Sequence, residues 1–273
     1  MNIVFAARHD MDYVSGGLVW VTVLTAELKR LGHTVSYCSA REFNIPKDTD
    51  AVIGLHCAMN IRIRDIYRGL LVDVTHGVIH DFDGPAPNCD VYLAVSEESQ
   101  ALVGECSILR NPIDTERFEN VGCGKTCKTI AVSSRRRLLP FIKKLRRKYI
   151  VHSLYGHPVP DVQNFIRSAD LVIATGRGCY EAMSMGKNVI VSGCNSSQSK
   201  HEIMDGFVNE ESFLKFRENN CSGRYTNKRV VSFDSEISKY SQEQGQINAQ
   251  LIRKYNDSTK IAKELLSILE GTL

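Results

Sequence analysis

The first half of the chain alternates short apolar runs with segments of helical periodicity. The apolar runs predict strands at Asn2–Ala7, Thr34–Ser39, Ala51–His56, Leu70–Val74, Val91–Val95 and Ser107–Leu109. After a glycine-bearing loop at Ser15–Gly17, apolar residues recur at helical spacing, which predicts a helix over Leu18–Leu31 that ends at Gly32. Strands that alternate with helices are typical of βαβ units, so this half is predicted to be α/β with a parallel, doubly wound sheet.

The same alternation starts again after a polar, glycine-bearing segment at Asn120–Lys128. It predicts strands at Thr129–Ser133 and Ile150–Leu154, a basic helix at Arg135–Lys148 and a helix at Asp161–Ser168. The pattern is weak from Asn195 to Asn227, and the chain ends in one long helix, about Gln244–Leu269. We therefore predict two Rossmann-like domains, 1–118 and 125–235, with helices over 236–273 that pack back on the first domain.

Composition excludes several classes of protein. The chain has 273 residues, 43% of them hydrophobic and 24% charged, which is ordinary for a soluble globular protein. No apolar run reaches the roughly 18 to 20 residues of a membrane span, and the N-terminus lacks a signal-peptide pattern. The nine cysteines are scattered, which favours reduced thiols and a cytoplasmic location, the host cytoplasm if the protein is viral.

The most informative string is ADLVIATGRGCYEAMSMGKNVIVSG, from Ala169 to Gly193. It predicts a buried strand at Leu171–Ala174, a turn at Gly176-Arg177-Gly178, a short helix with Glu181 in its first turn, and a second strand at Asn188–Ser192. A helix N-terminus at the carboxyl end of a parallel strand is suited to a phosphate group. The alternative is an ordinary strand–turn–helix unit that binds nothing.

This string resembles the donor-sugar signature of glycosyltransferases with the GT-B fold, and further strings resemble that family in the same order. They are Ser15-Gly16-Gly17 before a helix, His76-Gly77-Val78-Ile79-His80-Asp81 after a strand, Ala94-Val95-Ser96-Glu97, and Asn111-Pro112-Ile113-Asp114-Thr115-Glu116-Arg117-Phe118. The resemblance covers most of the chain and is close to the family-four type. It implies two Rossmann-like domains that face each other across a cleft, and a nucleotide sugar as the donor, with UDP-glucose expected.

The resemblance also assigns roles to residues. Glu181 is expected on the donor ribose, and Gly16 and Gly17 under the donor phosphates. The family's usual first glutamate, eight positions before Glu181, is Ile173 here, so the sugar contact must be replaced, by Arg177 or by backbone amides. The family's arginine–lysine pair is also out of register, and the chain is short for the family. The missing glutamate leaves both retaining and inverting chemistry open.

Glycosyl transfer needs positive charge at the leaving diphosphate. The expected source is Arg135–Arg137, after the Thr129–Ser133 strand, together with Gly16-Gly17 and Gly176–Gly178. In this half of the chain the predicted donor-binding residues are Ser134, Arg135, Arg136, Gly176, Arg177 and Gly178. Alternatively, Arg135–Arg137 lie on the solvent-exposed face of a helix and bind no ligand. No metal is expected, because the three Asp-x-Asp strings, at Asp10, Asp48 and Asp81, lie in unconvincing contexts.

His76, His80 and Asp81 are the candidates for acid–base catalysis, since an inverting transfer needs a base on the acceptor hydroxyl. A serine hydrolase is excluded because no Gly-x-Ser-x-Gly string is present. An NAD enzyme is disfavoured because no Gly-x-Gly-x-x-Gly string follows the first strand.

The acceptor is predicted from charge. The segment Arg135–Lys148 has eight basic residues and no acidic one, a pattern that can follow phosphates. The short chain resembles the small phage enzymes that glycosylate hydroxymethylated cytosine, so double-stranded DNA is the predicted partner. Alternatives are a transferase for lipopolysaccharide or another cell-surface polysaccharide, a nucleotide-sugar-binding protein without catalysis, and an epimerase of the same fold.

Overall fold

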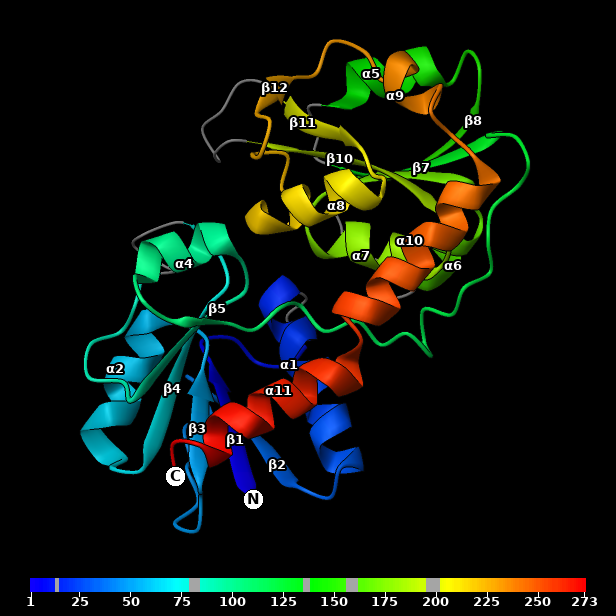
Figure 1. Ribbon diagram of the computed structural model, residues 1–273. Helices are drawn as coiled ribbons and strands as arrows, with labels where there is room; N and C mark the ends of the chain where they lie inside the picture. The colour runs from blue at the N-terminus through cyan, green and yellow to red at the C-terminus, as the bar shows by residue number, and fades with distance from the viewer. Residues whose placement is uncertain (13–14, 79–83, 135–137, 156–161, 195–201) are drawn as a thin grey trace. The chain divides into compact units, whose positions relative to one another are not determined.

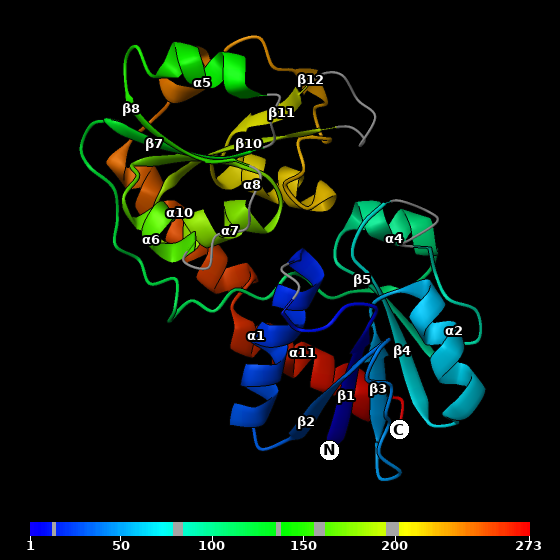
Figure 2. The same cartoon turned by 180° about the vertical axis from the view of Figure 1, so that it is seen from behind.

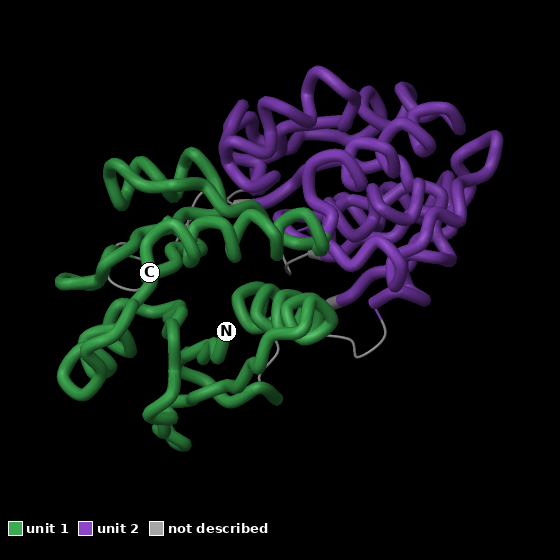
Figure 3. The backbone as a smooth tube through the Cα atoms, turned by 60° about the horizontal axis from the view of Figure 1, so that its bottom comes forward, with its two compact units in different colours: residues 1–112, 258–273 green, residues 113–257 purple. Residues whose placement is uncertain are grey.

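The computed structural model describes residues 1–12, 15–78, 84–134, 138–155, 162–194 and 202–273. It divides the chain into two compact units, one formed by 1–112 and 258–273, the other by 113–257 (Figures 1 and 3). We expected the first domain to end at residue 118 and the last helices to belong to it. The division instead falls after Pro112, and only the final helix joins unit 1.

Unit 1 is an α/β unit with a six-stranded, wholly parallel sheet of order β2-β1-β3-β4-β5-β6. Its strands are β1 Asn2–Ala7, β2 Thr34–Ser39, β3 Ala51–Gly54, β4 Leu70–Thr75, β5 Val91–Ala94 and β6 Ser107–Ile108. Its described helices are α1 Gly16–Arg30, α2 Cys57–Ile66, α4 Glu97–Val103 and α11 Ser258–Glu270. The sequence did not lead us to expect α2.

Alternate residues of β1 to β4 fill two separate cores. Ile3 and Phe5 of β1 pack with α1 and α11 on one face of the sheet, whereas Val4 and Ala6 pack with α2 on the other (Figure 2). All six residues of β4 are buried, as expected for a strand covered on both faces.

Unit 2 has a second six-stranded sheet, of order β12-β11-β10-β9-β7-β8. Its strands are β7 Thr129–Ser134, β8 Ile150–Tyr155, β9 Leu171–Ala174, β10 Asn188–Cys194, β11 Glu202–Phe207 and β12 Lys228–Arg229. Strands β7 to β10 run parallel, and β11 and β12 extend the sheet antiparallel. This extension begins within the stretch where the sequence pattern was weak.

Helices cover both faces of the unit 2 sheet. They are α5 Leu139–Leu145, α6 Val162–Arg167, α7 Arg177–Ser184, α8 Glu210–Phe216, the 3-10 turn η2 Arg217–Asn219, α9 Asp234–Ile237 and α10 Gln242–Tyr255. The core on one face is formed with α6, α7, α8 and α10, and the core on the opposite face with α5 and α9. None of the helices in the described ranges is long and apolar enough to cross a membrane.

The single long C-terminal helix that we predicted is two helices, α10 and α11. The break occurs because the backbone of Asn256 and Asp257 bonds to another segment: Ile113 donates its N–H to the Asn256 carbonyl at 2.7 Å. The Thr115 hydroxyl also donates to the Asp257 carboxylate at 2.7 Å. Such contacts compete with the helical ladder, so the chain leaves unit 2 at this point and returns to unit 1 as α11.

Candidate functional site

The turn between β9 and α7 lies at the carboxyl edge of the unit 2 sheet. Gly176 caps α7 with φ 57° and ψ −130°, a conformation that L residues rarely adopt. Its N–H donates to the Cys221 carbonyl at 2.8 Å, and its carbonyl accepts from Cys179 N–H at 3.0 Å. We expected Arg177 and Gly178 to belong to the turn, but helix α7 begins at Arg177, so both residues are helical.

The two glycines of this string therefore have different requirements, which alanine substitutions can test. Gly176→Ala should destabilise unit 2 by about 1–3 kcal/mol because its backbone conformation is strained for alanine. Gly178→Ala is the matched control: an added methyl group would lie 3.5 Å from Ala174 Cβ, an ordinary contact, and alanine favours the helix. Urea unfolding followed by circular dichroism measures both, and equal losses in the two variants would contradict the assignment.

Arg177 and Glu181 form a buried ion pair one helical turn apart. Arg177 Nε donates to Glu181 Oε1 at 2.8 Å, and the two side chains are only 10% and 9% exposed. Burial lowers the pKa of Arg177 and raises the pKa of Glu181, because each charge has lost its water, and the pairing opposes both shifts. The carboxylate that we predicted to be at the ribose is thus held by Arg177.

The surroundings of the pair add further charge. Asp114 and Arg117, which begin unit 2, act electrostatically on Arg177. Ile173, at the place of the family's first glutamate, is fully buried in β9 and cannot contact a ligand. Arg177 is therefore the charged side chain that the shortened string supplies next to Glu181.

The other predicted donor-binding residues of unit 2, Ser134, Arg135 and Arg136, lie at and after the end of β7. Strand β7 lies next to β9, with Val132 opposite Ile173, so the carboxyl ends of the two strands meet at one edge. The backbone of Ser134 ends β7 at that edge. Arg135 and Arg136 lie outside the described residues.

The predicted basic helix is shorter than expected, because α5 spans only Leu139–Leu145. The basic residues of its second half and of the segment that follows form what we call the α5 patch: Lys143, Lys144, Arg146, Arg147 and Lys148. The patch residues come just before β8 in the chain. The first residues of β8 and β7 lie side by side, since Ile150 N–H donates to the Lys128 carbonyl at 2.9 Å. The patch thus lies toward the amino edge of the sheet, and α5 and α7 cover opposite faces. Within unit 2 it is separated from the β9–α7 turn.

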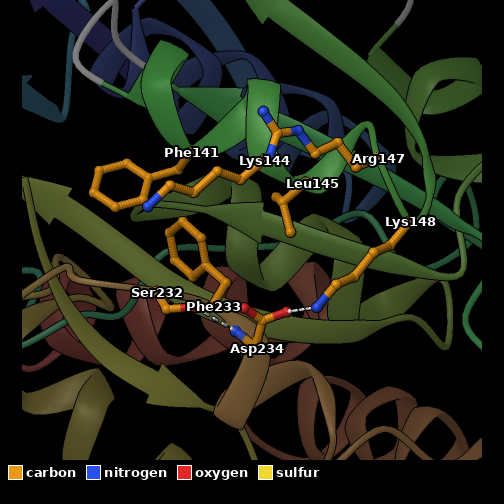
Figure 4. A pocket seen from close by; sticks show the side chains of 8 residues that line it. All are labelled: Phe141, Lys144, Leu145, Arg147, Lys148, Ser232, Phe233 and Asp234. Atoms are coloured by element: carbon orange, nitrogen blue, oxygen red, sulfur yellow. Dashed lines mark hydrogen bonds and ion pairs between the residues drawn. The ribbon is translucent and has the colours of Figure 1, made fainter.

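A cavity of about 190 Å³ opens beside the α5 patch (Figure 4). Phe141 and Phe233 meet there edge to face, with ring centres 5.9 Å apart. Lys148 Nζ is 2.8 Å from the Asp234 carboxylate, which raises the pKa of Lys148 and lowers that of Asp234. Lys144 and Arg147 also line the cavity, which therefore has three cationic side chains and one carboxylate.

In unit 1 the glycines predicted to lie under the donor phosphates are not in a loop. Ser15 caps α1 by accepting the Leu18 N–H at 3.2 Å, and Gly16 and Gly17 are the first residues of that helix. A methyl group on Gly17 would lie 3.3 Å from Leu55 Cδ2, whereas one on Gly16 would meet nothing. Gly17 therefore allows α1 to pack closely against Leu55, whereas the space beside Gly16 is open.

His76 directly follows β4, and its ring lies edge to face with Trp20 at 5.1 Å between centres. His80 and Asp81 lie outside the described residues. The structure adds two further histidines: His9 follows β1 and His56 follows β3, and their ring centres are 6.3 Å apart. The signal in the sequence is that each of the three histidines comes within two residues of the end of a buried strand, at the carboxyl edge of a parallel sheet.

Comparisons with known proteins bear on the fold. No protein-family model and no curated protein matches the chain, but solved structures do. The lipopolysaccharide outer core galactosyltransferase WaaB matches with TM-score 0.60 and 12% identity over 100% of both chains. The starch synthase IV catalytic domain from Arabidopsis thaliana, bound to ADP and acarbose, matches with TM-score 0.59 and 10% identity over 99% of both. A UDP-GlcNAc 2-epimerase from Neisseria meningitidis, bound to UDP-GlcNAc, matches with TM-score 0.53 and 12% identity over 99% of this chain and 100% of that one.

These likenesses agree with the sheet orders and the alternating helices of both units. The chain has the two-domain α/β fold of the GT-B glycosyltransferases.

Proposed function

We propose that this chain transfers a sugar from a nucleoside diphosphate sugar to a hydroxyl group of an acceptor. The observation that carries the proposal is the buried Arg177–Glu181 pair beside the β9–α7 turn, within a chain that has the GT-B fold. The pair supports the proposal because it would offer a carboxylate to ribose hydroxyls and a neighbouring cation to phosphate. Structurally similar proteins were solved with ADP or UDP-GlcNAc bound, which supports a nucleotide sugar as the donor.

In the proposed reaction, the bond from the sugar C1 to the diphosphate oxygen breaks, and a bond from C1 to the acceptor oxygen forms. Charge builds on the leaving diphosphate, and Arg177 and the N–H groups at the start of α7 would stabilise it. If the transfer inverts the configuration, His76 would accept the proton of the acceptor hydroxyl. Because the protein supplies this charge, we expect activity to survive EDTA.

Glu181→Ala tests the donor site. Loss of its hydrogen bonds to the ribose should weaken donor binding by about 1.5–3 kcal/mol, measured by calorimetry with UDP-glucose. The matched control is Glu211→Ala, which removes the carboxylate of an exposed ion pair of the same i,i+4 type, Glu211–Lys215, and should leave the affinity unchanged. A folded Glu181→Ala protein with wild-type affinity would remove this assignment.

The donor is best identified by a thermal-shift panel of nucleotide sugars, among which we expect UDP-glucose to stabilise the protein most. Release of free nucleoside diphosphate only when an acceptor is present would establish transfer. Donor binding without turnover on any acceptor would favour a binding protein. Interconversion of a nucleotide amino sugar would favour an epimerase, which the likeness to the Neisseria enzyme makes worth including.

For the acceptor we propose double-stranded DNA with hydroxymethylated or already glycosylated cytosine. The α5 patch supports this, because its five cations have no acidic residue among them in the sequence. Lys148 is paired with Asp234, so the proposed phosphate contacts are those of the other four. Since the patch lies on another face of unit 2 from α7, it would hold phosphates away from the reacting base. A duplex can span such a separation, because it carries one charge about every 1.7 Å.

Replacing four of these residues by glutamine tests the DNA proposal: Lys143, Lys144, Arg146 and Arg147. Each lost phosphate contact should reduce the slope of log affinity against log salt by about one, while the affinity for UDP-glucose stays nearly unchanged. The matched control replaces four cations elsewhere in the unit: Lys215, Lys228, Arg229 and Lys239. If the wild-type protein has no affinity for DNA at low salt, the DNA proposal is wrong, and lipopolysaccharide and other glycans become the acceptors to assay.

A further inference from the structure

The cavity beside α5 combines aromatic and cationic side chains on the far side of unit 2 from the β9–α7 turn. It lies between α5, with the residues that follow this helix, and the segment from Ser232 to Asp234, where α9 starts (Figure 4). Helices α5 and α9 pack on the face of the sheet opposite to α7. A ligand of this cavity would therefore be distinct from the sugar donor.

Phe141 gives the cavity an aromatic wall that a planar ring can cover. Phe233 is 2% exposed and belongs to the core, whereas Phe141 is half-buried and packs at the margin of that core. The two rings meet edge to face, so their faces are not stacked on each other. A flat ring placed against Phe141 would remove more of its apolar surface from water, and the faces of all nucleobases can stack on an aromatic side chain.

The charges that line the cavity are not balanced. Both carboxylate oxygens of Asp234 are engaged, one by Lys148 Nζ at 2.8 Å and the other by the Ser232 hydroxyl, which donates at 2.7 Å. Lys144 and Arg147 are exposed and make no hydrogen bond or ion pair to another residue in the described ranges. Three cations and one carboxylate thus leave two unit positive charges at the edge of the cavity.

These two features together define the chemistry of a ligand. A phosphate monoester carries a charge of about −1.5 to −2 at pH 7, which matches two cations, whereas a phosphate inside a nucleic-acid strand carries one negative charge. Inorganic phosphate alone would leave Phe141 uncovered. The cavity volume of about 190 Å³ is smaller than that of sites for drug-sized ligands, so it suits one ring, with the phosphate held outside by the exposed cations.

We propose that this cavity is a second binding site, for a nucleotide with a terminal phosphate, whose base lies against Phe141 and whose phosphate is held by Lys144 and Arg147. Stacking and charge-assisted hydrogen bonds act on different parts of the ligand, so the whole nucleotide binds more tightly than either part. Two sources share this chemistry: a free nucleoside monophosphate and the phosphorylated end of a DNA strand. The site does not depend on the transfer reaction proposed above.

Calorimetry of the full-length protein with deoxycytidine monophosphate, deoxycytidine and inorganic phosphate tests the site. Wild-type protein should bind the monophosphate more tightly than the other two. Phe141→Ala should lower the affinity for the monophosphate about 5- to 150-fold, the effect of one lost base–aromatic contact, and leave that for inorganic phosphate unchanged. The double variant Lys144→Gln, Arg147→Gln should lower the affinity for both phosphate-bearing probes by about 10-fold or more.

The chain offers a matched control for each change. Lys143→Gln with Arg146→Gln removes the same charge from the same segment, at positions that do not line the cavity, and Leu139→Ala removes an exposed apolar side chain of the same helix. Both controls should bind the monophosphate as the wild type does. Equal affinities in the Lys144→Gln, Arg147→Gln protein and in its control overturn the inference, and these exposed positions decide it even if Phe141→Ala does not fold. Wild-type protein that binds the monophosphate no more tightly than inorganic phosphate also overturns it.

A short single-stranded DNA, with and without a 5′-phosphate, distinguishes the two sources. For a strand end, the phosphorylated strand should bind more tightly than the unphosphorylated strand and the free monophosphate, and Lys144→Gln with Arg147→Gln should abolish this advantage. For a free nucleotide, the phosphorylated strand should bind no more tightly than the monophosphate. Failure of the proposed transfer is a separate result, because it would abolish turnover of UDP-glucose and leave the binding of the monophosphate unchanged.

Discussion

Replacing Leu265 by alanine is expected to lower the free energy of unfolding of unit 1 by about 2–5 kcal/mol. Leu265 is fully buried in the core that α11 forms with α1 and one face of the sheet. Removing its side chain leaves a cavity among groups that the surrounding secondary structure holds in place. The expected effect is large because α11 closes a core whose other members lie more than 140 residues earlier in the chain.

The measurement can separate the two units because the chain has a single tryptophan. Trp20 is fully buried in the unit 1 core, so its fluorescence in urea reports that unit, whereas far-ultraviolet circular dichroism reports both. Leu265→Ala should shift the fluorescence transition to lower urea concentration. Leu273→Ala, at a position 67% exposed, is the control and should change little. Unchanged tryptophan unfolding in Leu265→Ala would contradict the assignment of α11 to this core.

Asp73→Asn is expected to stabilise unit 1 at neutral pH. Asp73 lies in the buried strand β4, where it accepts hydrogen bonds from Asn60 and from Ala86 N–H, the latter at 3.1 Å. Burial raises its pKa to about 6 despite these bonds. Both carboxylate oxygens of Asp73 are acceptors, one for Asn60 Nδ2 and one for Ala86 N–H, so an amide at position 73 removes the buried charge but keeps only one acceptor. With the Asn60 amide turned over, its Oδ1, which has no donor among the described residues, accepts from the new amide nitrogen, and the new amide oxygen still accepts from Ala86 N–H.

The sign of the pH dependence follows from the direction of the pKa shift. Because the pKa is higher in the folded state, the folded protein binds the proton more tightly. The contribution of Asp73 to stability is therefore fully present below about pH 4 and is lost as the pH rises to about 6. A shift of this size corresponds to up to about 3 kcal/mol. Tryptophan-detected unfolding at pH 4 and pH 8 should show this loss in the wild type and not in Asp73→Asn. A loss of similar size in the variant would rule out Asp73 as its source.

The strands were predictable from sequence because burial on both faces gives short, continuous apolar runs. β1, β2 and β9 have the bounds we expected, and α1 ends beside Gly32, whose φ of 91° favours glycine. The break between α10 and α11 was not predictable, because the apolar periodicity continues through it. It depends on a tertiary pairing between Ile113 and Asp257, which no local pattern encodes.

The candidate site was predictable in its position and less so in its detail. The string around Glu181 identified the strand and the short helix, but it placed Glu181 in the first turn, whereas α7 starts at Arg177 and has no acidic residue in its first turn. The burial of Arg177 could not be foreseen, because an arginine after a glycine reads as a solvent-exposed turn residue. Likewise, the topology of β7, α5 and β8 separates the α5 patch from the β9–α7 turn, although both are conspicuous in the sequence.

The discontinuity of unit 1 has a consequence for biosynthesis. The residues of unit 2 are all translated before α11, so a nascent chain can complete unit 2 while unit 1 still lacks the helix that covers part of one face. Domains usually fold during synthesis in order from the N-terminus. Here the N-terminal unit would reach its final form after the second unit, with apolar surface exposed until α11 has left the ribosome. Its need for chaperones should therefore be concentrated in the interval before α11 emerges.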